Sequence, residues 1–176
     1  AEYSGYYSGI AKINQVITML FYPIGQAIFP YHSKKYEISF MNGYSSVVRL
    51  SKKVIPVFTV VSFGIILFRE QIVWFVLGKD FANTADLLII MALLPVLSII
   101  SNLMGTQILV ASGHTKEYSR AFLRGAFISV ALYFILGYFY AIWGVVLGAI
   151  IGEIVSLFLL HIEVRRILKN EGKFNL

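Results

Sequence analysis

The sequence is 176 residues long, 58% hydrophobic and 14% charged, with a mean hydropathy of +0.76 and a net charge of +6. Soluble domains are usually about 45–50% apolar and about 25% charged, so this composition excludes a small soluble core and predicts an integral membrane protein. There is no cysteine, which excludes disulfides and thiolate chemistry. Because the chain begins with Ala1 and no signal peptide precedes its first apolar run, we expect a fragment of a longer protein.

Five apolar runs are long enough, or nearly so, to cross a bilayer, which takes roughly 20 helical residues. The second run is interrupted at Arg69, and we expect the part after this break to lie at the membrane interface, where Trp74 is favoured. The fold class expected is therefore all-α, a polytopic membrane helix bundle with about five transmembrane helices. The expected helices cover roughly residues 6–29, 54–77, 85–110, 122–140 and 144–162.

The first expected helix carries a row of residues, here called the polar stripe, that fall within roughly 40° of one line at 100° per residue. They are Ser8, Lys12, Gln15, Met19, Tyr22 and Gln26. A lysine at the bilayer centre costs about 2.5 kcal/mol or more, so this side is expected to face protein or a water-filled cavity. The alternative, that Lys12 extends to the outer headgroups, leaves Gln15 and Gln26 unexplained. The expected substrate-cavity residues on this helix are Lys12, Gln15, Tyr22 and Gln26.

The third expected helix has a weaker polar face formed by Ser98, Ser101, Asn102 and Gly105, and Pro95 can kink the helix beside it. Serine and asparagine often join helices to one another in membranes. Cavity lining by Ser98 and Asn102 and helix–helix hydrogen bonding both remain open.

The fifth expected helix has small residues at strict four-residue steps: Gly144, Gly148, Gly152 and Ser156. This spacing allows two helix backbones to touch, so the expected role is helix packing. Beside this row, Glu153 falls at mid-depth. An acid inside the membrane is by default a functional candidate, here a proton site or an ion-pair partner, although it can also be protonated and hydrogen-bonded.

Basic residues gather in three segments, which sets the expected orientation. They are Lys34, Lys35, Arg49, Lys52 and Lys53 after the first helix, Lys116, Arg120 and Arg124 before the fourth, and Arg165, Arg166, Lys169 and Lys173 after the fifth. The opposite side is expected to hold Lys79 alone, together with an aromatic belt of Tyr3, Tyr6, Tyr7, Trp74, Tyr138, Tyr140 and Trp143. Basic loops stay in the cytoplasm, so the C-terminus is expected there. The positive charge then reflects topology and contact with anionic lipid, and no nucleic-acid partner is expected.

No reaction centre is evident in the sequence. His32, His114 and His161 are scattered near the expected cytoplasmic ends, without metal-ligand spacing. Phosphate-loop and zinc-protease motifs are absent, and no paired carboxylates suggest glycosyl chemistry. We therefore expect neither an enzyme, nor a metal, nor a cofactor.

Three segments of the sequence resemble one known family of proteins. Residues 5–30 read GYYSGIAKINQVITMLFYPIGQAIFP, which resembles the start of the second half of bacterial O-antigen flippases. Residues 94–121 read LPVLSIISNLMGTQILVASGHTKEYSRA, where a Gly-Thr-Gln-Ile-Leu core precedes a glycine, a basic residue and Lys-Glu-Tyr. Residues 143–160 read WGVVLGAIIGEIVSLFLL and are similar to the last helix of the family, with the acid at Glu153.

The resemblance implies the polysaccharide-transporter branch of the multidrug/oligosaccharidyl-lipid/polysaccharide flippase superfamily. Its members have two six-helix bundles facing a central cavity, and they move undecaprenyl-diphosphate-linked oligosaccharides across the bacterial inner membrane for O-antigen or other surface polysaccharides. Residues 1–176 would then be a partial C-terminal lobe that lacks the first bundle and one more helix. The implied partners are the lipid-linked oligosaccharide, membrane lipid, the missing N-terminal lobe, and a polysaccharide polymerase with its chain-length regulator.

Three rival functions stay open at this point. A drug/cation antiporter of the same superfamily would need acids in its cavity, whereas the polar stripe is cationic. A membrane glycosyltransferase or polymerase would need sizeable catalytic loops, and the expected long loop, about Tyr31 to Lys53, is basic and has no acid pair. A helix bundle without any transport role would leave the polar stripe unexplained.

Overall fold

The computed structural model describes residues 2–78, 81 and 85–174, and within this part of the chain every regular element is a helix. The predicted all-α class is therefore confirmed. In chain order the longer elements are α1 (Glu2–Ile38), α2 (Phe40–Leu67), α3 (Arg69–Leu77), α4 (Ala85–Met91), α5 (Leu94–Asn102), the π-helix η2 (Leu103–Val110) and α6 (Thr115–Phe174).

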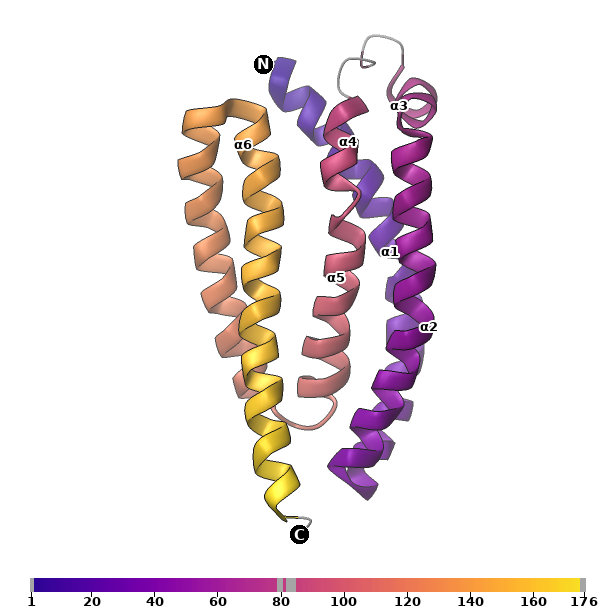
Figure 1. The fold of residues 1–176 in the computed structure, drawn as a ribbon, viewed down its shortest axis with the longest axis vertical. Helices are drawn as coiled ribbons and strands as arrows, with labels where there is room; N and C mark the ends of the chain where they lie inside the picture. The colour runs from indigo at the N-terminus through magenta and orange to yellow at the C-terminus, as the bar shows by residue number, and fades with distance from the viewer. Residues whose placement is uncertain (1, 79–80, 82–84, 175–176) are drawn as a thin grey trace.

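Three helical stretches among the described residues are long and apolar enough to cross a membrane: Phe40–Leu67, Ala85–Val110 and Thr115–Glu171. The third is bent back on itself, and Figure 1 shows its two arms side by side, so it can cross twice. The predicted membrane helix bundle is thus confirmed. The segment predicted as a first span, 6–29, lies within α1 but is not among these stretches. Its polar stripe is one physical reason, because each polar side chain lowers the mean hydropathy of the helix.

The expected long loop between the first two helices does not exist. Helix α1 continues to Ile38, and α2 begins two residues later at Phe40, so only Ser39 separates them. The Ser39 side chain accepts a hydrogen bond from the backbone N–H of Asn42 at 3.1 Å, which caps the start of α2. A low hydropathy shows only that a segment does not lie in lipid, and it does not exclude a helix. Lysine and glutamate, which occur in this segment, are good helix formers in water.

A buried histidine fixes this helix junction. His32 is 1% exposed, and its Nδ1 lies 2.8 Å from the hydroxyl of Ser46 in α2. That hydroxyl donates its proton to the carbonyl of Gly43 at 2.7 Å, so Nδ1 of the neutral ring is the donor to Ser46. Burial lowers the pKa of His32 below its usual 6.5, which favours the neutral ring that this arrangement needs.

The third predicted helix, 85–110, is divided into α4, α5 and η2. The break falls at Ala92 and Leu93, just ahead of Pro95, because proline has no N–H to donate to the carbonyl four residues earlier, at Met91, and suits the first turn of a new helix. From Leu103 the chain widens into a π-helix, in which the N–H of Ala111 reaches the carbonyl of Thr106 at 3.0 Å. Such π-turns are rare and frequently occur at functional sites.

The fourth and fifth predicted helices form α6, which is sharply bent at Ala141, with φ 50° and ψ −128°. The arms come so close that a Cβ on Gly144 would clash with the backbone oxygen of Leu136. A Cβ on Gly152 would likewise clash with the side chain of Ser129. The predicted row of small residues therefore faces the first arm of α6.

Among the described residues the core forms two clusters, one toward each end of the bundle. The larger joins α1, α2, α5, η2 and α6, and the smaller joins α1, α2, α3, α4 and α6. The larger cluster contains Phe21, Phe40, Val47, Phe58, Ile99, Leu103, Ile108, Leu109, Ala121, Leu160, Val164 and Ile167. The smaller one contains Ile13, Ile65, Val73, Ala85, Leu87, Leu88, Met91, Ala92 and Val146.

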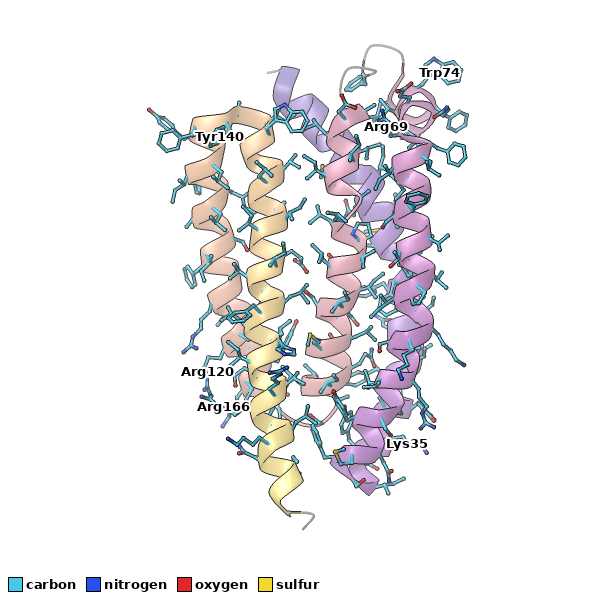
Figure 2. The ribbon with its side chains drawn as sticks, in the orientation of Figure 1. Lys35, Arg69, Trp74, Arg120, Tyr140 and Arg166 are labelled. Atoms are coloured by element: carbon cyan, nitrogen blue, oxygen red, sulfur yellow. The ribbon has the colours of Figure 1, made fainter. Side chains whose placement is uncertain are left out.

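The two ends of the bundle differ in charge, as Figure 2 shows. Lys35, Arg120 and Arg166 lie toward the end where the C-terminus is, and Trp74 and Tyr140 lie at the opposite end. Arg69 also lies at that opposite end, so the prediction that Lys79 is the only cation there is wrong. Arg69 contacts Asp86 at 3.4 Å and Glu70 at 3.5 Å, so two acids offset its charge. Lys79 lies outside the described residues.

Candidate substrate-binding site

The polar stripe lies on the side of α1 that this bundle leaves open. Ile13 and Phe21, on the packed side, are 8% and 3% exposed, whereas Tyr22 is 64% exposed. Lys12, Gln15 and Gln26 are also exposed. Within the described residues no side chain pairs with Lys12. The side chain of Ser8 is outside the described part of the structure.

A cavity of about 320 Å³, here called the α1–η2 cavity, adjoins the part of this stripe that contains Tyr22 and Gln26. It brings together two predicted residues of α1 with one of α5, although they are far apart in the sequence. Its lining residues are Tyr22, Gly25, Gln26, Phe29, Asn102, Thr106, Gln107 and Val110. The cavity is thus lined by amides, hydroxyls and aromatic rings.

Gln107 holds η2 against α1 at this cavity. Its side chain is 1% exposed, and its Nε2 donates a 3.0 Å hydrogen bond to the carbonyl of Gly25. Gly25 is buried at this contact, and a Cβ added there would meet Asn102 Oδ1 and Gln107 Nε2 at 3.7 Å. The close approach of the two helices therefore depends on a polar contact as well as on packing.

Two acceptor oxygens at this cavity have no donor within the described structure. They are Asn102 Oδ1 and Gln107 Oε1, both inaccessible to solvent. Leaving a buried acceptor unpaired costs about 1–3 kcal/mol. A ligand or water that donates hydrogen bonds would remove this cost, so the α1–η2 cavity favours a donor-rich, uncharged group such as a sugar hydroxyl.

A second, smaller cavity of about 190 Å³, here the Glu153 cavity, lies between α5, η2 and α6. Ser101 Oγ donates a 2.7 Å hydrogen bond to Glu153 Oε1 and so links α5 to the second arm of α6. Asn102 and Thr106 line this cavity as well as the α1–η2 cavity. Its lining residues are Ser98, Ser101, Asn102, Thr106, Tyr118, Phe122, Glu153, Ser156 and Leu160.

The predicted cavity residues are thus divided between two cavities, and two of them line neither. Tyr22, Gln26 and Asn102 meet at the α1–η2 cavity, and Ser98 lies with Glu153 in the second cavity. Lys12 and Gln15 line neither cavity.

Sequence reasoning missed the central residue of the site, Gln107, as well as Thr106. Thr106 follows Asn102 by four residues, so extending the predicted polar face by one turn would have found it. Gln107 follows by five residues and belongs to that face only because the backbone there is a π-helix.

Comparison with known proteins found one similarity that bears on function. The chain is 31% identical over 153 residues, 85% of its length, to a protein of Shigella dysenteriae named "Putative O-antigen transporter". That alignment covers 37% of the length of the Shigella protein. No family model matches the chain, and no solved structure matches it. The chain is therefore a membrane helix bundle similar, over most of its length, to about a third of a protein named as an O-antigen transporter.

Proposed function

We propose that the chain is part of a flippase that moves undecaprenyl-diphosphate-linked oligosaccharides across the bacterial inner membrane for O-antigen or another surface polysaccharide. The Shigella relative supports transport as the general activity, since that is what its name states. Because the chain corresponds to 37% of that relative, we propose that it forms a partial C-terminal lobe that works with an N-terminal lobe.

The observation that carries the proposal is the pair of unpaired oxygens at the α1–η2 cavity, Asn102 Oδ1 and Gln107 Oε1. Sugar hydroxyls donate hydrogen bonds and would satisfy both if the two amide side chains, which line the cavity, turn their oxygens toward it. Tyr22 and Phe29 add aromatic surface on which the apolar face of a sugar ring can pack, and Gln26 and Thr106 add further polar groups. A cavity of this size, lined by apolar and aromatic residues with a few polar groups, is typical of small-molecule sites.

In this proposal Lys12 meets the diphosphate. It is an exposed cation on the same side of α1 as Tyr22 and Gln26, and about 21 Å of helix separates it from Gln26 at 1.5 Å per residue. A lysine ammonium offsets phosphate charge in many sites. The polar stripe would then face the second lobe across a central cavity, with Gln15 between the two contact points, while the lipid tail stays in the bilayer.

The Glu153 cavity has a separate proposed role as a proton or ion-pair site. It shares Asn102 and Thr106 with the α1–η2 cavity. A change in the charge of Glu153 would therefore change the electrostatic potential at two residues that line the proposed sugar site. The orientation we propose places the C-terminus and the basic end in the cytoplasm.

Two rival functions are less well supported. A cation antiporter would place acids in the main cavity, but no acid lines the α1–η2 cavity. A glycosyltransferase would need a catalytic loop, but the segment from Tyr31 to Lys53 is helical except at Ser39.

The proposal is tested by replacing Gln26 in the full-length protein. Gln26→Leu should lower the amount of surface polysaccharide several-fold at an unchanged protein level, because the exposed amide is removed without disturbing the core. The measurement is complementation of a transport-deficient strain, read on a polysaccharide gel. Gln71→Leu makes the same chemical change at an exposed position of α3, away from both cavities, and is the matched control. Equal polysaccharide in both variants would contradict a sugar site at Gln26.

A further inference from the structure

A third hollow lies on the other side of α5 and η2, separate from the proposed sugar site. It has a volume of about 340 Å³ and is called here the apolar groove. Figure 1 shows α5 between α2 and the second arm of α6, and residues of all three helical stretches line the groove. The lining residues are Tyr44, Val47, Val48, Ser51, Ile55, Ile100, Leu103, Met104, Ile108, His161, Val164, Arg165 and Leu168.

Apolar side chains line most of the apolar groove. Leu103, Met104 and Ile108 of η2 face it, whereas Thr106 and Gln107 of the same π-helix face the α1–η2 cavity. The two sites therefore use opposite faces of one element. An apolar cavity does not hold water well, so in a bilayer this groove is expected to fill with a hydrocarbon chain.

One end of the apolar groove is cationic. Arg165 lines it with an exposed side chain, and His161, four residues earlier, lies on the same face of α6. Among the described residues no acid lies within ion-pair distance of Arg165, whereas the neighbouring Arg166 contacts Glu163 at 3.5 Å. No aspartate or glutamate lines the groove.

The opposite bank, on α2, is polar. Tyr44 and Ser51 contribute hydroxyls to the lining, and Arg49, Lys52 and Lys53 are exposed on the same stretch of α2 without lining the groove. A cationic side chain and hydroxyl groups at a hydrocarbon-lined groove complement a molecule with an anionic head and an apolar tail. Basic pockets between transmembrane helices on the cytoplasmic side bind anionic lipid headgroups.

We propose that the apolar groove is a binding site for an anionic phospholipid, with one acyl chain between α2 and α6 and its phosphate at Arg165. A guanidinium forms two parallel hydrogen bonds with a phosphate, which explains an arginine here without an acidic partner. The site does not depend on the transport function, because it shares no lining residue with either of the other cavities.

The test measures stabilisation by lipid of the whole polypeptide purified in detergent. Dioleoyl phosphatidylglycerol should raise the melting temperature more than dioleoyl phosphatidylcholine, and inorganic phosphate should not. Arg165→Gln should raise the half-saturating phosphatidylglycerol concentration about tenfold or more, as expected for a lost charged hydrogen bond. Arg120→Gln removes the same charge from an exposed position at the same end, outside the groove, and should behave like the parent.

A second variant tests the proposed binding of an acyl chain in the apolar groove. Val48→Trp fills the groove from α2 but keeps Arg165, and it should weaken phosphatidylglycerol binding to a similar degree. The proposal is wrong if phosphatidylcholine stabilises equally, or if inorganic phosphate alone reproduces the effect. It is also wrong if Arg165→Gln binds as the parent does, the result expected if another helix of the same polypeptide fills the groove.

Discussion

Gly144→Ala should unfold the α6 hairpin, with a larger loss of stability than alanine at any other glycine whose surroundings the structure describes. The added Cβ would clash with the backbone oxygen of Leu136, and backbone atoms cannot move aside as a side chain can. Overpacking of this kind costs about 3 kcal/mol or more where the neighbour is rigid. We expect a lower yield and a clearly lower melting temperature in detergent.

Two other glycines provide a graded control. A Cβ on Gly148 would lie 3.4 Å from the backbone of Leu132 and Tyr133, an ordinary contact, so Gly148→Ala should be mild. A Cβ on Gly64 in α2 would meet nothing within 4 Å, so Gly64→Ala should be neutral or stabilising through helix propensity. A melting temperature for Gly144→Ala equal to that for Gly64→Ala would show that the two arms are not in contact near the bend.

Replacing Lys12 should reduce transport, and the loss should be greater for a neutral side chain than for a cationic one and greatest for an anionic one. Lys12→Arg should retain some surface polysaccharide, Lys12→Ala should lose most of it, and Lys12→Glu should lose essentially all. In a partly dehydrated cavity with an effective dielectric near 20, a charge pair at 4 Å is worth on the order of 4 kcal/mol before desolvation costs. If only about a third of this interaction energy remains after desolvation, its loss still corresponds to about a tenfold decrease in activity. The measurement is polysaccharide per unit of full-length protein in a complementation assay.

The competing explanation, that Lys12 only reaches the outer headgroups, predicts the opposite trend. Lys12→Ala would then be harmless or stabilising, because it removes a costly group from the bilayer. Lys34→Ala, at an exposed position on the same helix but in its basic end, serves as the control for nonspecific charge effects. Full activity of Lys12→Ala would remove Lys12 from the proposed site.

The parts of the fold that could be predicted are those that depend on hydrocarbon burial. Runs of apolar residues located the helices, and the four-residue spacing from Gly144 to Ser156 identified the side that meets a neighbouring helix. Helix ends could not be located in this way. α2 begins at Phe40 rather than near residue 54, and α6 continues to Phe174, because lysine and arginine are good helix formers and let a helix extend beyond its hydrophobic region.

The candidate site was predicted in part. The polar stripe on α1 follows from a regular helix, and its members Tyr22 and Gln26 do line a cavity. The residue that closes this cavity, Gln107, could not be placed by a wheel of 100° per residue, because the π-helix changes the register after Asn102. Local geometry of this kind depends on tertiary contacts, here the hydrogen bond from Gln107 to Gly25.

The central claim is that the α1–η2 cavity binds the saccharide of a lipid-linked oligosaccharide, and photo-cross-linking tests it most directly. A photoreactive amino acid at position 26 of the full-length protein is irradiated in membranes that contain radiolabelled undecaprenyl-diphosphate oligosaccharide. We predict a labelled adduct at position 26 that unlabelled oligosaccharide competes away, and none from the same probe at position 71 in α3. Labelling at position 71 equal to that at position 26, or no competable adduct at position 26, would contradict the account.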